Sequence, residues 1–306
     1  MHHLSRSFSR SLVVAAAVVA TGCAQNAAPT NVHDHDTNVT PIATAATSAA
    51  PGDSSIAPGA TTAAARLASS PRHGEWVTIR TGPQAGDSLR LWVVYPQRST
   101  KAPVVVVVHE IFGLSTWIRS VADQLAADGF IAIAPDFLTG KVAFAPPDTV
   151  PSQVATAAIR TLDMDVVQRQ IDAAAAYGMA LPAALPRYGV VGFCWGGSVA
   201  FQHAVHSPTL GASVVYYGTS PASASLTSVR APVLGLYGGE DARVGATIPP
   251  ADSAMRALGK EYTHHSFAGA GHGFLRGQDQ MNGANLAAAR TAWPMTIQFF
   301  RDKLEH

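Results

Sequence analysis

Apolar and polar residues alternate in two short stretches near the start of a folded region that begins at about His73. Residues 75–80 and 89–95 follow this two-residue period, which is typical of strands with one buried face. The next stretch, residues 103–108, is a proline followed by five valines. Continuous apolarity predicts a strand covered on both faces, as in parallel sheets. Further strands are expected at residues 130–134, 189–193, 213–217, 233–237 and, less apolar, 262–267.

Helical stretches separate the expected strands. Residues 115–127 and 164–177 are long and free of glycine, and two shorter or later stretches lie at 253–258 and 284–300. A further helix, at residues 196–206, opens with two glycines. Because strands and helices alternate along the chain, we predict an α/β fold with a mostly parallel central sheet and helices on both faces. There is no internal repeat, and residues 72–306 are expected to form one domain.

The chain begins with the pattern of an export signal. Arg6 and Arg10 supply a positive region, and residues 12–20 form an apolar run. This run is shorter than the roughly 20 residues that a helix needs to cross a bilayer. The segment ends in Val-Ala-Thr-Gly-Cys, which resembles the lipobox that precedes a lipidated cysteine in bacterial lipoproteins.

Two interpretations of this leader remain open. In the first, residues 1–23 are a signal peptide and Cys23 is the lipid-attachment site, so the protein is an outer-membrane lipoprotein that faces the periplasm. The residue after the cysteine, Ala24, favours the outer membrane by resemblance because it is not an aspartate. In the second, an ordinary secretory signal is cut near Ala24, and the mature protein is soluble in the periplasm or secreted.

A low-complexity stretch joins the leader to the folded region. Residues 24–71 are rich in Ala, Thr, Ser, Pro and Asn and have no apolar period. Such a stretch cannot bury enough surface to offset its chain entropy, so we predict a disordered tether. Residues 33–36 read His-Asp-His-Asp, which is either a metal site or part of a solvated linker. A flexible segment lacks the outer hydrogen bonds that orient metal ligands, which favours the linker.

Charge and cysteine content narrow the possible functions. The formal net charge is +1 at pH 7 and no cluster of Lys and Arg stands out, so we expect no nucleic-acid partner. The two cysteines are Cys23 and Cys194. Exported proteins often use cysteines in disulfides, but Cys23 lies at the end of the leader and is not expected to pair with Cys194. Each cysteine therefore requires its own explanation.

The most informative segment surrounds Cys194. Residues 190–197 read Val-Val-Gly-Phe-Cys-Trp-Gly-Gly, so an expected buried strand runs into a G-x-C-x-G turn and then a helix. This is the nucleophile-elbow arrangement, in which flanking glycines leave room for a strained turn. The N-terminus of the following helix favours a thiolate over a thiol. We predict that Cys194 is a nucleophile; the alternative is a buried structural cysteine.

A nucleophile of this kind needs a proton shuttle later in the chain. In this fold the order is nucleophile, acid and then histidine. Asp241 follows the expected strand 233–237, and His272 lies in a glycine-rich loop after the last expected strand. We predict that His272 is the general base and that Asp241 orients its ring, with Glu240 as the alternative acid. Four other histidines lie within expected helices or strands and are interpreted as structural or exposed: His203, His206, His264 and His265.

Four motifs together resemble the dienelactone hydrolase family. They occur in the family's order, between about His73 and the C-terminus, as His-Glu-Ile-Phe-Gly at 109–113, Gly-Phe-Cys-Trp-Gly-Gly at 192–197, Gly-Glu-Asp at 239–241 and Gly-His-Gly-Phe at 271–274. The resemblance implies an α/β-hydrolase fold and a Cys–His–Asp triad that opens a lactone ring. It also implies that no metal and no organic cofactor take part.

The same resemblance implies roles for further residues. Glu110 matches a glutamate that interacts with the resting cysteine and helps to generate the thiolate when substrate binds. The alternative is a loop carboxylate held by backbone amides. The oxyanion hole of the family corresponds to the backbone amides of Ile111 and Trp195.

Substrate recognition in the family involves arginines. Arg276 matches an arginine that binds a substrate carboxylate, and a guanidinium suits bidentate capture of such a group. The alternative is a surface arginine. A second arginine of the family would fall within residues 145–161, but Arg160 cannot be placed at the matching position.

We therefore predict an exported hydrolase that cleaves a lactone or carboxylic ester through Cys194, His272 and Asp241. The expected partner is a small-molecule ester or lactone, the membrane is contacted only through a lipid anchor, and the enzyme is expected to be a monomer. Residues 141–158 are expected to cover the site as a lid. Two alternatives are a broad carboxylesterase or thioesterase with the same triad, and a non-catalytic anchored binding protein with the same fold.

Overall fold

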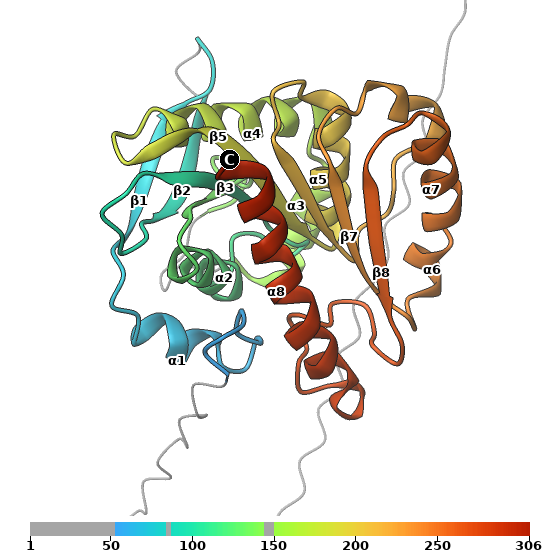
Figure 1. Ribbon diagram of the computed structural model, residues 1–306. Helices are drawn as coiled ribbons and strands as arrows, with labels where there is room; N and C mark the ends of the chain where they lie inside the picture. The colour runs from blue at the N-terminus through green and yellow to red at the C-terminus, as the bar shows by residue number, and fades with distance from the viewer. Residues whose placement is uncertain (1–52, 84–86, 144–149) are drawn as a thin grey trace, which may run out of the picture. The chain divides into compact units, whose positions relative to one another are not determined.

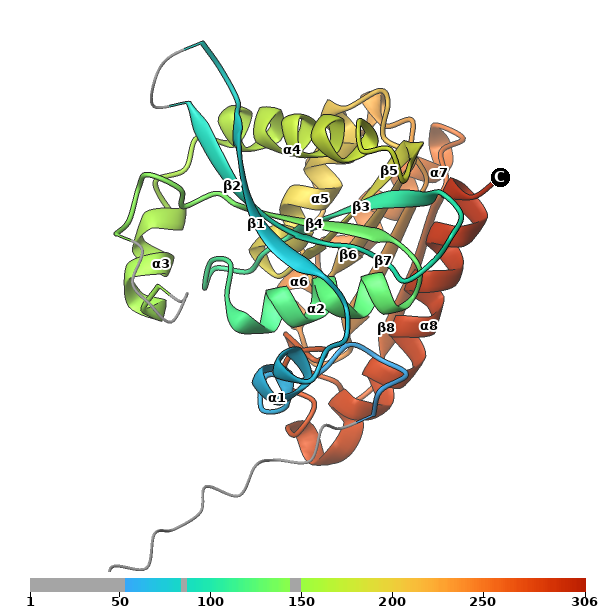
Figure 2. The ribbon, with the colours of Figure 1, turned by 90° about the vertical axis from the view of Figure 1, so that its left-hand side faces the viewer.

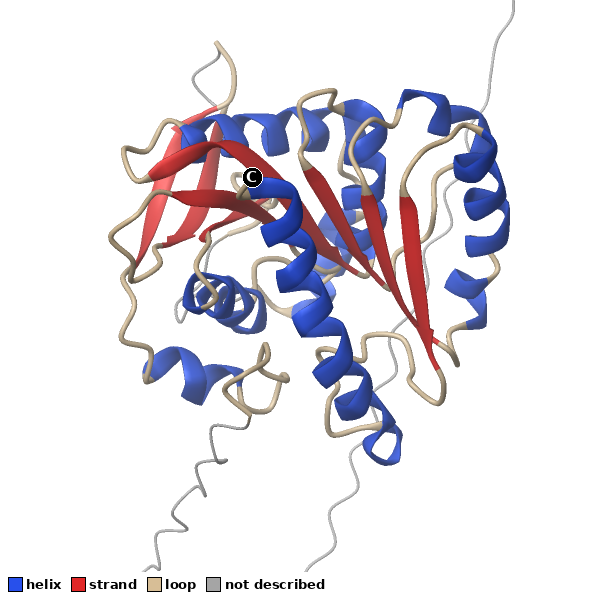
Figure 3. Ribbon diagram, viewed as in Figure 1, coloured by secondary structure: helices blue, strands red, loops and turns tan. Residues whose placement is uncertain are grey.

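An eight-stranded sheet organises the residues that this computed structural model describes, which are 53–83, 87–143 and 150–306 (Figures 1 and 3). The spatial order is β1-β2-β4-β3-β5-β6-β7-β8. The pairs β1–β2 and β2–β4 are antiparallel, and all the other neighbours are parallel. The strands are β1 (Gly74–Arg80), β2 (Ser88–Val94), β3 (Ala102–Val108), β4 (Ile131–Asp136), β5 (Ala184–Phe193), β6 (Ala212–Tyr216), β7 (Val233–Gly238) and β8 (Tyr262–Phe267). The predicted α/β class and mostly parallel sheet are confirmed.

Helices cover both faces of this sheet (Figure 2). One face carries α2 (Thr116–Ala127) and α8 (Ala284–Leu304), whose apolar residues share one hydrophobic cluster. The other face carries α4 (Met164–Met179), α5 (Trp195–His206) and α7 (Ile248–Ala257), whose apolar residues share a second cluster.

The valine run of β3 explains this two-sided packing. All seven residues of β3 are buried. Successive side chains of a strand point to opposite faces, so Val105 and Val107 join the cluster under α2 and α8. Val104, Val106 and Val108 join the cluster under α4 and α5. Burial of a valine side chain contributes about 1.5–3 kcal/mol, so the central strand stabilises both layers.

The folded unit begins earlier than the predicted end of the tether. Residues 53–70, here called the strap, include α1 (Ala63–Ala68) and pack beside α2 (Figure 2). Ile56 and Ala57 are buried in the core, and Trp117 Nε1 donates a hydrogen bond to the Pro58 carbonyl at 2.8 Å. The strap contributes few apolar residues to the core and is otherwise polar. Its sequence therefore has no apolar pattern that would have predicted a folded segment. The leader, Cys23 and residues 24–52 of the predicted tether lie outside the described residues.

The predicted lid region contains α3 (Ser152–Ile159), while residues 144–149 lie outside the described part of the chain. Ala155 and Ile159 form a small cluster with Leu138, and Trp195 packs against it. Thr156 Oγ1 donates a hydrogen bond to the Ile111 carbonyl at 3.3 Å. This helix therefore lies against the turn that follows β3.

Three short elements complete the described structure: η1 (Ser223–Ser228), α6 (Ala242–Gly245) and η2 (Met281–Gly283). None of the helices in the described part of the chain combines the length and apolarity that a membrane crossing requires.

Candidate active site

Four predicted site residues meet at one edge of the sheet, where the parallel strands end. Glu110 follows β3, Cys194 follows β5, Asp241 follows β7 and His272 follows β8. In open α/β sheets the carboxyl ends of the strands form the edge at which ligands bind. The order of the strands thus gathers residues from distant parts of the chain.

Cys194 occupies a strained turn between β5 and α5. Its backbone has φ 57° and ψ −116°, in the positive-φ region that residues with a side chain rarely adopt. Packing of the flanking glycines holds this geometry. A Cβ atom on Gly192 would lie 1.9 Å from the Gly196 carbonyl oxygen, and one on Gly196 would lie 2.4 Å from the His109 carbonyl oxygen. Only glycine fits at either position, so the elbow follows directly from the sequence.

The His272 ring lies between Cys194 and Asp241. Its Nε2 lies 3.2 Å from Cys194 Sγ, and its Nδ1 lies 2.5 Å from Asp241 Oδ2. A carboxylate only accepts, so Nδ1 donates to Asp241 and Nε2 presents its lone pair to the sulfur. Asp241 is buried, and its Oδ1 accepts a hydrogen bond from the Val244 amide, which fixes the carboxylate at the start of α6. The three side chains have the geometry of a nucleophile, a base and an orienting acid.

The alternative acid and the competing histidines lie elsewhere. Glu240 is exposed, and it is Asp241 that contacts His272. His203 is buried and is hydrogen-bonded through its two ring nitrogens to Gln168 and Tyr188. The other three are either paired with aspartates or exposed, as His206 contacts Asp172, His264 lies near Asp252 and His265 faces solvent.

Glu110 and Arg276 form an ion pair beside the nucleophile. Arg276 Nε lies 3.3 Å from Glu110 Oε2, although the angles of this contact are not those of a hydrogen bond. The guanidinium also lies over the Phe112 ring, 4.8 Å from its centre. Glu110 is almost completely buried, and this burial raises its pKa to about 7 against the opposing charge of Arg276.

The same surroundings keep the resting sulfur protonated. Burial, followed by the charge of Glu110, raises the pKa of Cys194, while the Trp195 amide acts in the opposite direction. The helix N-terminus alone was expected to favour a thiolate, and it does not outweigh these two effects. Burial and the charge of Glu110 together favour the thiol over the thiolate at Cys194.

The two predicted oxyanion donors lie close together. Trp195 is the first residue of α5, where an amide has no acceptor within its own helix. Ile111 lies in the turn after β3, and Gly196 packs against the carbonyl groups of Val108 and His109 just before this turn. Arg160 is exposed at the end of α3, whereas Arg243 in α6 lies close enough for its charge to oppose the rise in the pKa of Cys194.

Sequence reasoning missed Tyr217, which follows the end of β6. Its backbone has φ 40°, and its buried ring meets the His272 ring edge-on at 5.2 Å. Its hydroxyl is buried without a hydrogen-bond partner among the described residues. Burial and the charges of Glu110 and Cys194 raise the pKa of Tyr217, so the hydroxyl stays protonated and can donate. The sequence feature that could have indicated Tyr217 is its position directly after a predicted parallel strand, at the edge of the sheet where the other site residues lie.

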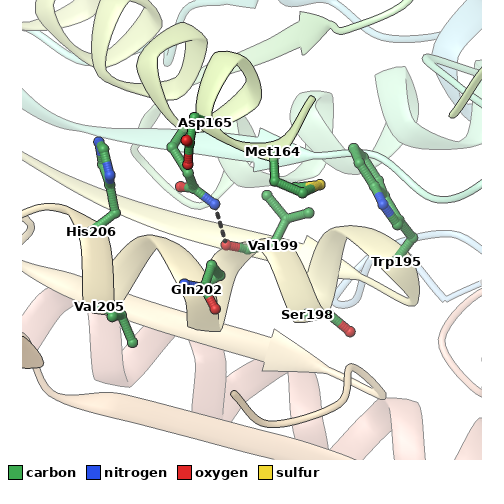
Figure 4. A pocket seen from close by; sticks show the side chains of 9 residues that line it. Met164, Asp165, Trp195, Ser198, Val199, Gln202, Val205 and His206 are labelled. Atoms are coloured by element: carbon green, nitrogen blue, oxygen red, sulfur yellow. Dashed lines mark hydrogen bonds between the residues drawn. The ribbon is translucent and has the colours of Figure 1, made fainter. Parts of the chain in front are cut away.

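A cavity of about 420 Å³ lies beside the elbow, between α4 and α5 (Figure 4). Met164, Val199 and Gln202 line it, and Trp195 stands at one end. Neither Cys194 nor His272 contributes to its walls. Across residues 53–83, 87–143 and 150–306, no group of three His, Cys, Asp or Glu side chains is placed to hold a metal ion.

Comparison with known proteins identifies the family of this chain. The Dienelactone hydrolase family matches residues 89–304. A Salmonella typhimurium protein named "Putative carboxymethylenebutenolidase" is 32% identical over 238 residues, which cover 72% of this chain and 86% of that protein. An Escherichia coli K12 protein of the same name is 30% identical over 235 residues, covering 72% and 84%. The crystal structure of a "Putative Dienelactone Hydrolase" from Klebsiella pneumoniae superposes with a TM-score of 0.63 at 26% identity, covering 75% of this chain and 98% of that one. This chain therefore belongs to the dienelactone hydrolase family of α/β-hydrolases and is a hydrolase of that type.

Proposed function

We propose that this enzyme cleaves a carboxylic ester or lactone with Cys194 as the nucleophile, His272 as the general base and Asp241 as the residue that orients it. The observation that supports the proposal is the 3.2 Å contact between His272 Nε2 and Cys194 Sγ, made on an elbow whose strain exposes the sulfur. Strain of this kind concentrates at functional sites because the surrounding structure must maintain it.

Substrate binding provides the activation that the resting thiol needs. A carboxylate on the substrate would compete with Glu110 for the Arg276 guanidinium. Without its cation, the buried Glu110 carboxylate becomes a stronger base, because the charge of Arg276 opposes the rise in the pKa of Glu110. Glu110 then accepts the proton of Cys194 and leaves a thiolate, which the His272 ring helps to stabilise.

The chemical steps follow from this thiolate. The sulfur attacks the carbonyl carbon, an S–C bond forms, and the carbonyl electron pair moves to the oxygen. The amides of Ile111 and Trp195 stabilise this oxyanion, an effect worth roughly 3 kcal/mol per donor in related chemistry. The C–O bond then breaks, and the leaving oxygen takes the proton that Glu110 received from Cys194. His272 removes a proton from water, and the resulting hydroxide attacks the thioester carbon. The C–S bond then breaks, and His272 returns its proton to the sulfur, which restores the thiol.

The Cys194→Ala variant tests the nucleophile. It should retain the fold and lose at least about 1,000-fold in turnover of a simple aryl ester, because no other group can form the acyl intermediate. Steady-state kinetics and circular dichroism measure the two expectations. Turnover at the wild-type rate would refute the proposal.

A broad carboxylesterase or thioesterase with the same triad is the second candidate, supported by the exposed side of Arg276 and by the exposed position of Arg160. Two esters that differ only in a free carboxylate separate the candidates. If Arg276→Ala leaves both rates unchanged, the broad esterase is favoured.

We also propose that the enzyme is exported and anchored through Cys23. This rests on the leader pattern alone, with Arg6 and Arg10 before the apolar run. Mass spectrometry of the mature N-terminus distinguishes a lipidated Cys23 from ordinary cleavage near Ala24.

A further inference from the structure

The carbonyl group of Glu110 is held from two sides. His109 Nδ1 lies 2.8 Å from this oxygen, and the Gly113 amide donates to it at 3.1 Å. A carbonyl oxygen only accepts, so Nδ1 carries the hydrogen and both lone pairs of the oxygen are used. The Gly113 bond closes the turn after β3, with Gly113 at a positive φ of 73°. The imidazole therefore acts as a second restraint on a turn that is already closed.

The His109 ring is fixed and uncharged. It is completely buried, and burial lowers the pKa of His109 to about 4, so the ring stays neutral near neutral pH. It stacks on Trp195 with ring centres 5.6 Å apart at 25°, and it contacts Phe137 at 5.1 Å. Its Nε2 is buried and has no hydrogen-bond partner among the described residues.

These contacts join the two proposed oxyanion donors. A peptide unit is planar and trans, so the direction of the Glu110 carbonyl fixes the opposite direction of the Ile111 N–H. Hydrogen bonds accepted by a carbonyl also polarise the N–H of the same peptide. The face of the His109 ring meanwhile packs on Trp195, whose amide is the other donor.

We infer that His109 is a positioning residue of the oxyanion hole, which orients the Glu110–Ile111 peptide through Nδ1 and supports Trp195 through ring stacking. It contacts neither the sulfur nor the proposed base, so it acts through the two amides. The inference rests on the proposed function, because an oxyanion hole matters only if a tetrahedral adduct forms at Cys194.

The test compares His109→Phe with His109→Asn. Phenylalanine keeps a ring against Trp195 but cannot donate to the Glu110 carbonyl. Asparagine loses the ring but can place an amide N–H near the position of Nδ1. Complete loss of an oxyanion donor costs about 100- to 1,000-fold in kcat, and misplacement of a donor that is still present should cost less. We expect His109→Phe to lower kcat for an aryl ester roughly 10- to 100-fold with KM nearly unchanged, and His109→Asn to recover part of this loss.

Two further readouts separate positioning from general damage. A trifluoromethyl ketone forms a tetrahedral adduct in which the thiolate bonds to the carbonyl carbon and the oxygen becomes negative, so its affinity should fall by about the same factor as kcat/KM. Alkylation of Cys194 by iodoacetamide forms no oxyanion, and its rate should change less than about twofold. His203→Phe is the matched control, since His203 is also completely buried and hydrogen-bonded but lies away from the turn.

Unchanged kcat in His109→Phe would overturn the inference. So would a parallel fall in alkylation and hydrolysis, or an equal loss of kcat in His203→Phe, because each would indicate a general structural effect. Failure of the proposed function is recognised separately. If the proposed function is correct, the wild type mixed with the ketone gives a fluorine NMR signal of the adduct, and Cys194→Ala does not. If the proposed function fails, the wild type gives no such signal either.

Discussion

Two loops bring the two sides of this active site together, and they are held in different ways. The elbow at Cys194 is fixed by backbone packing within a few residues, with Gly192 against Gly196 and Gly196 against His109. The loop that carries His272 and Arg276 is held partly by the strap. The Ala60 amide donates to the Arg276 carbonyl at 2.8 Å, and Gln278 Nε2 donates to the Ala57 carbonyl, also at 2.8 Å.

The difference separates the chemistry of the site from its recognition of substrate. The elbow belongs to the region that matches the family, residues 89–304, whereas the strap lies before it. The geometry of the elbow that carries Cys194 is therefore determined within the region that matches the family. The position of Arg276, which is proposed to bind a substrate carboxylate, depends in part on a segment outside the matched region. Substitutions in the two regions should accordingly affect different kinetic parameters.

Among the substitutions that compare the two loops, the largest effect is expected from Gly196→Ala. Its new Cβ would lie 2.4 Å from the backbone carbonyl oxygens of His109 and Val108, which cannot move without opening the elbow. We expect activity to fall at least about 100-fold and the free energy of unfolding to fall by about 1–3 kcal/mol, measured by kinetics and urea unfolding. Gly245→Ala is the control, because nothing lies within 4 Å of its Cβ. An active Gly196→Ala enzyme would show that the elbow is not held by its backbone.

Glu110 lies between the two regions, and its burial predicts a pH-dependent stability. Because burial raises the pKa of Glu110 to about 7, the folded protein keeps a proton in a window where the unfolded chain has released it. Folding stability then falls as the pH rises through this window. Glu110→Gln removes this titratable group. The unfolding free energy of wild type, relative to that of the variant, should therefore fall by up to about 3 kcal/mol between about pH 5 and about pH 8.

Urea unfolding at several pH values measures this difference. Glu240→Gln is the control, because it makes the same replacement of a carboxylate by an amide at an exposed position. If the difference in unfolding free energy between wild type and Glu110→Gln did not change with pH, the buried carboxylate would titrate as it does in the unfolded chain.

The smallest effect is expected from Gln278→Ala, which removes the side-chain hydrogen bond from the Arg276 loop to the strap. A lost hydrogen bond of about 1 kcal/mol corresponds to roughly a fivefold change. We expect KM to rise by about this factor for an ester with a free carboxylate, with little change for a neutral ester. Gln298→Ala, on the exposed side of α8, removes a hydrogen bond to Asp302 and should change neither value. Equal effects on both esters would argue against a link between the strap and substrate recognition.

Most of the fold could be predicted because its long elements have strong apolar patterns. Each of the eight strands lies close to its predicted position, and β8 begins and ends at the predicted residues 262 and 267. The missed helices bury very little: α1 buries only Ala63, and α3 buries only Ala155 and Ile159. A helix with one or two core contacts has no detectable period, so its place depends on the rest of the fold.

The sequence by itself determined the sheet, the elbow and the identity of the residues that now lie together at Cys194. Gly192 and Gly196 encode the elbow locally, since no larger residue fits there. Tertiary structure decided what depends on distant neighbours. It placed Asp241 rather than Glu240 against His272, buried Glu110 beside Arg276, and docked the strap against the loop that carries Arg276. These outcomes follow from burial and from long-range contacts, which spacing along the chain does not specify.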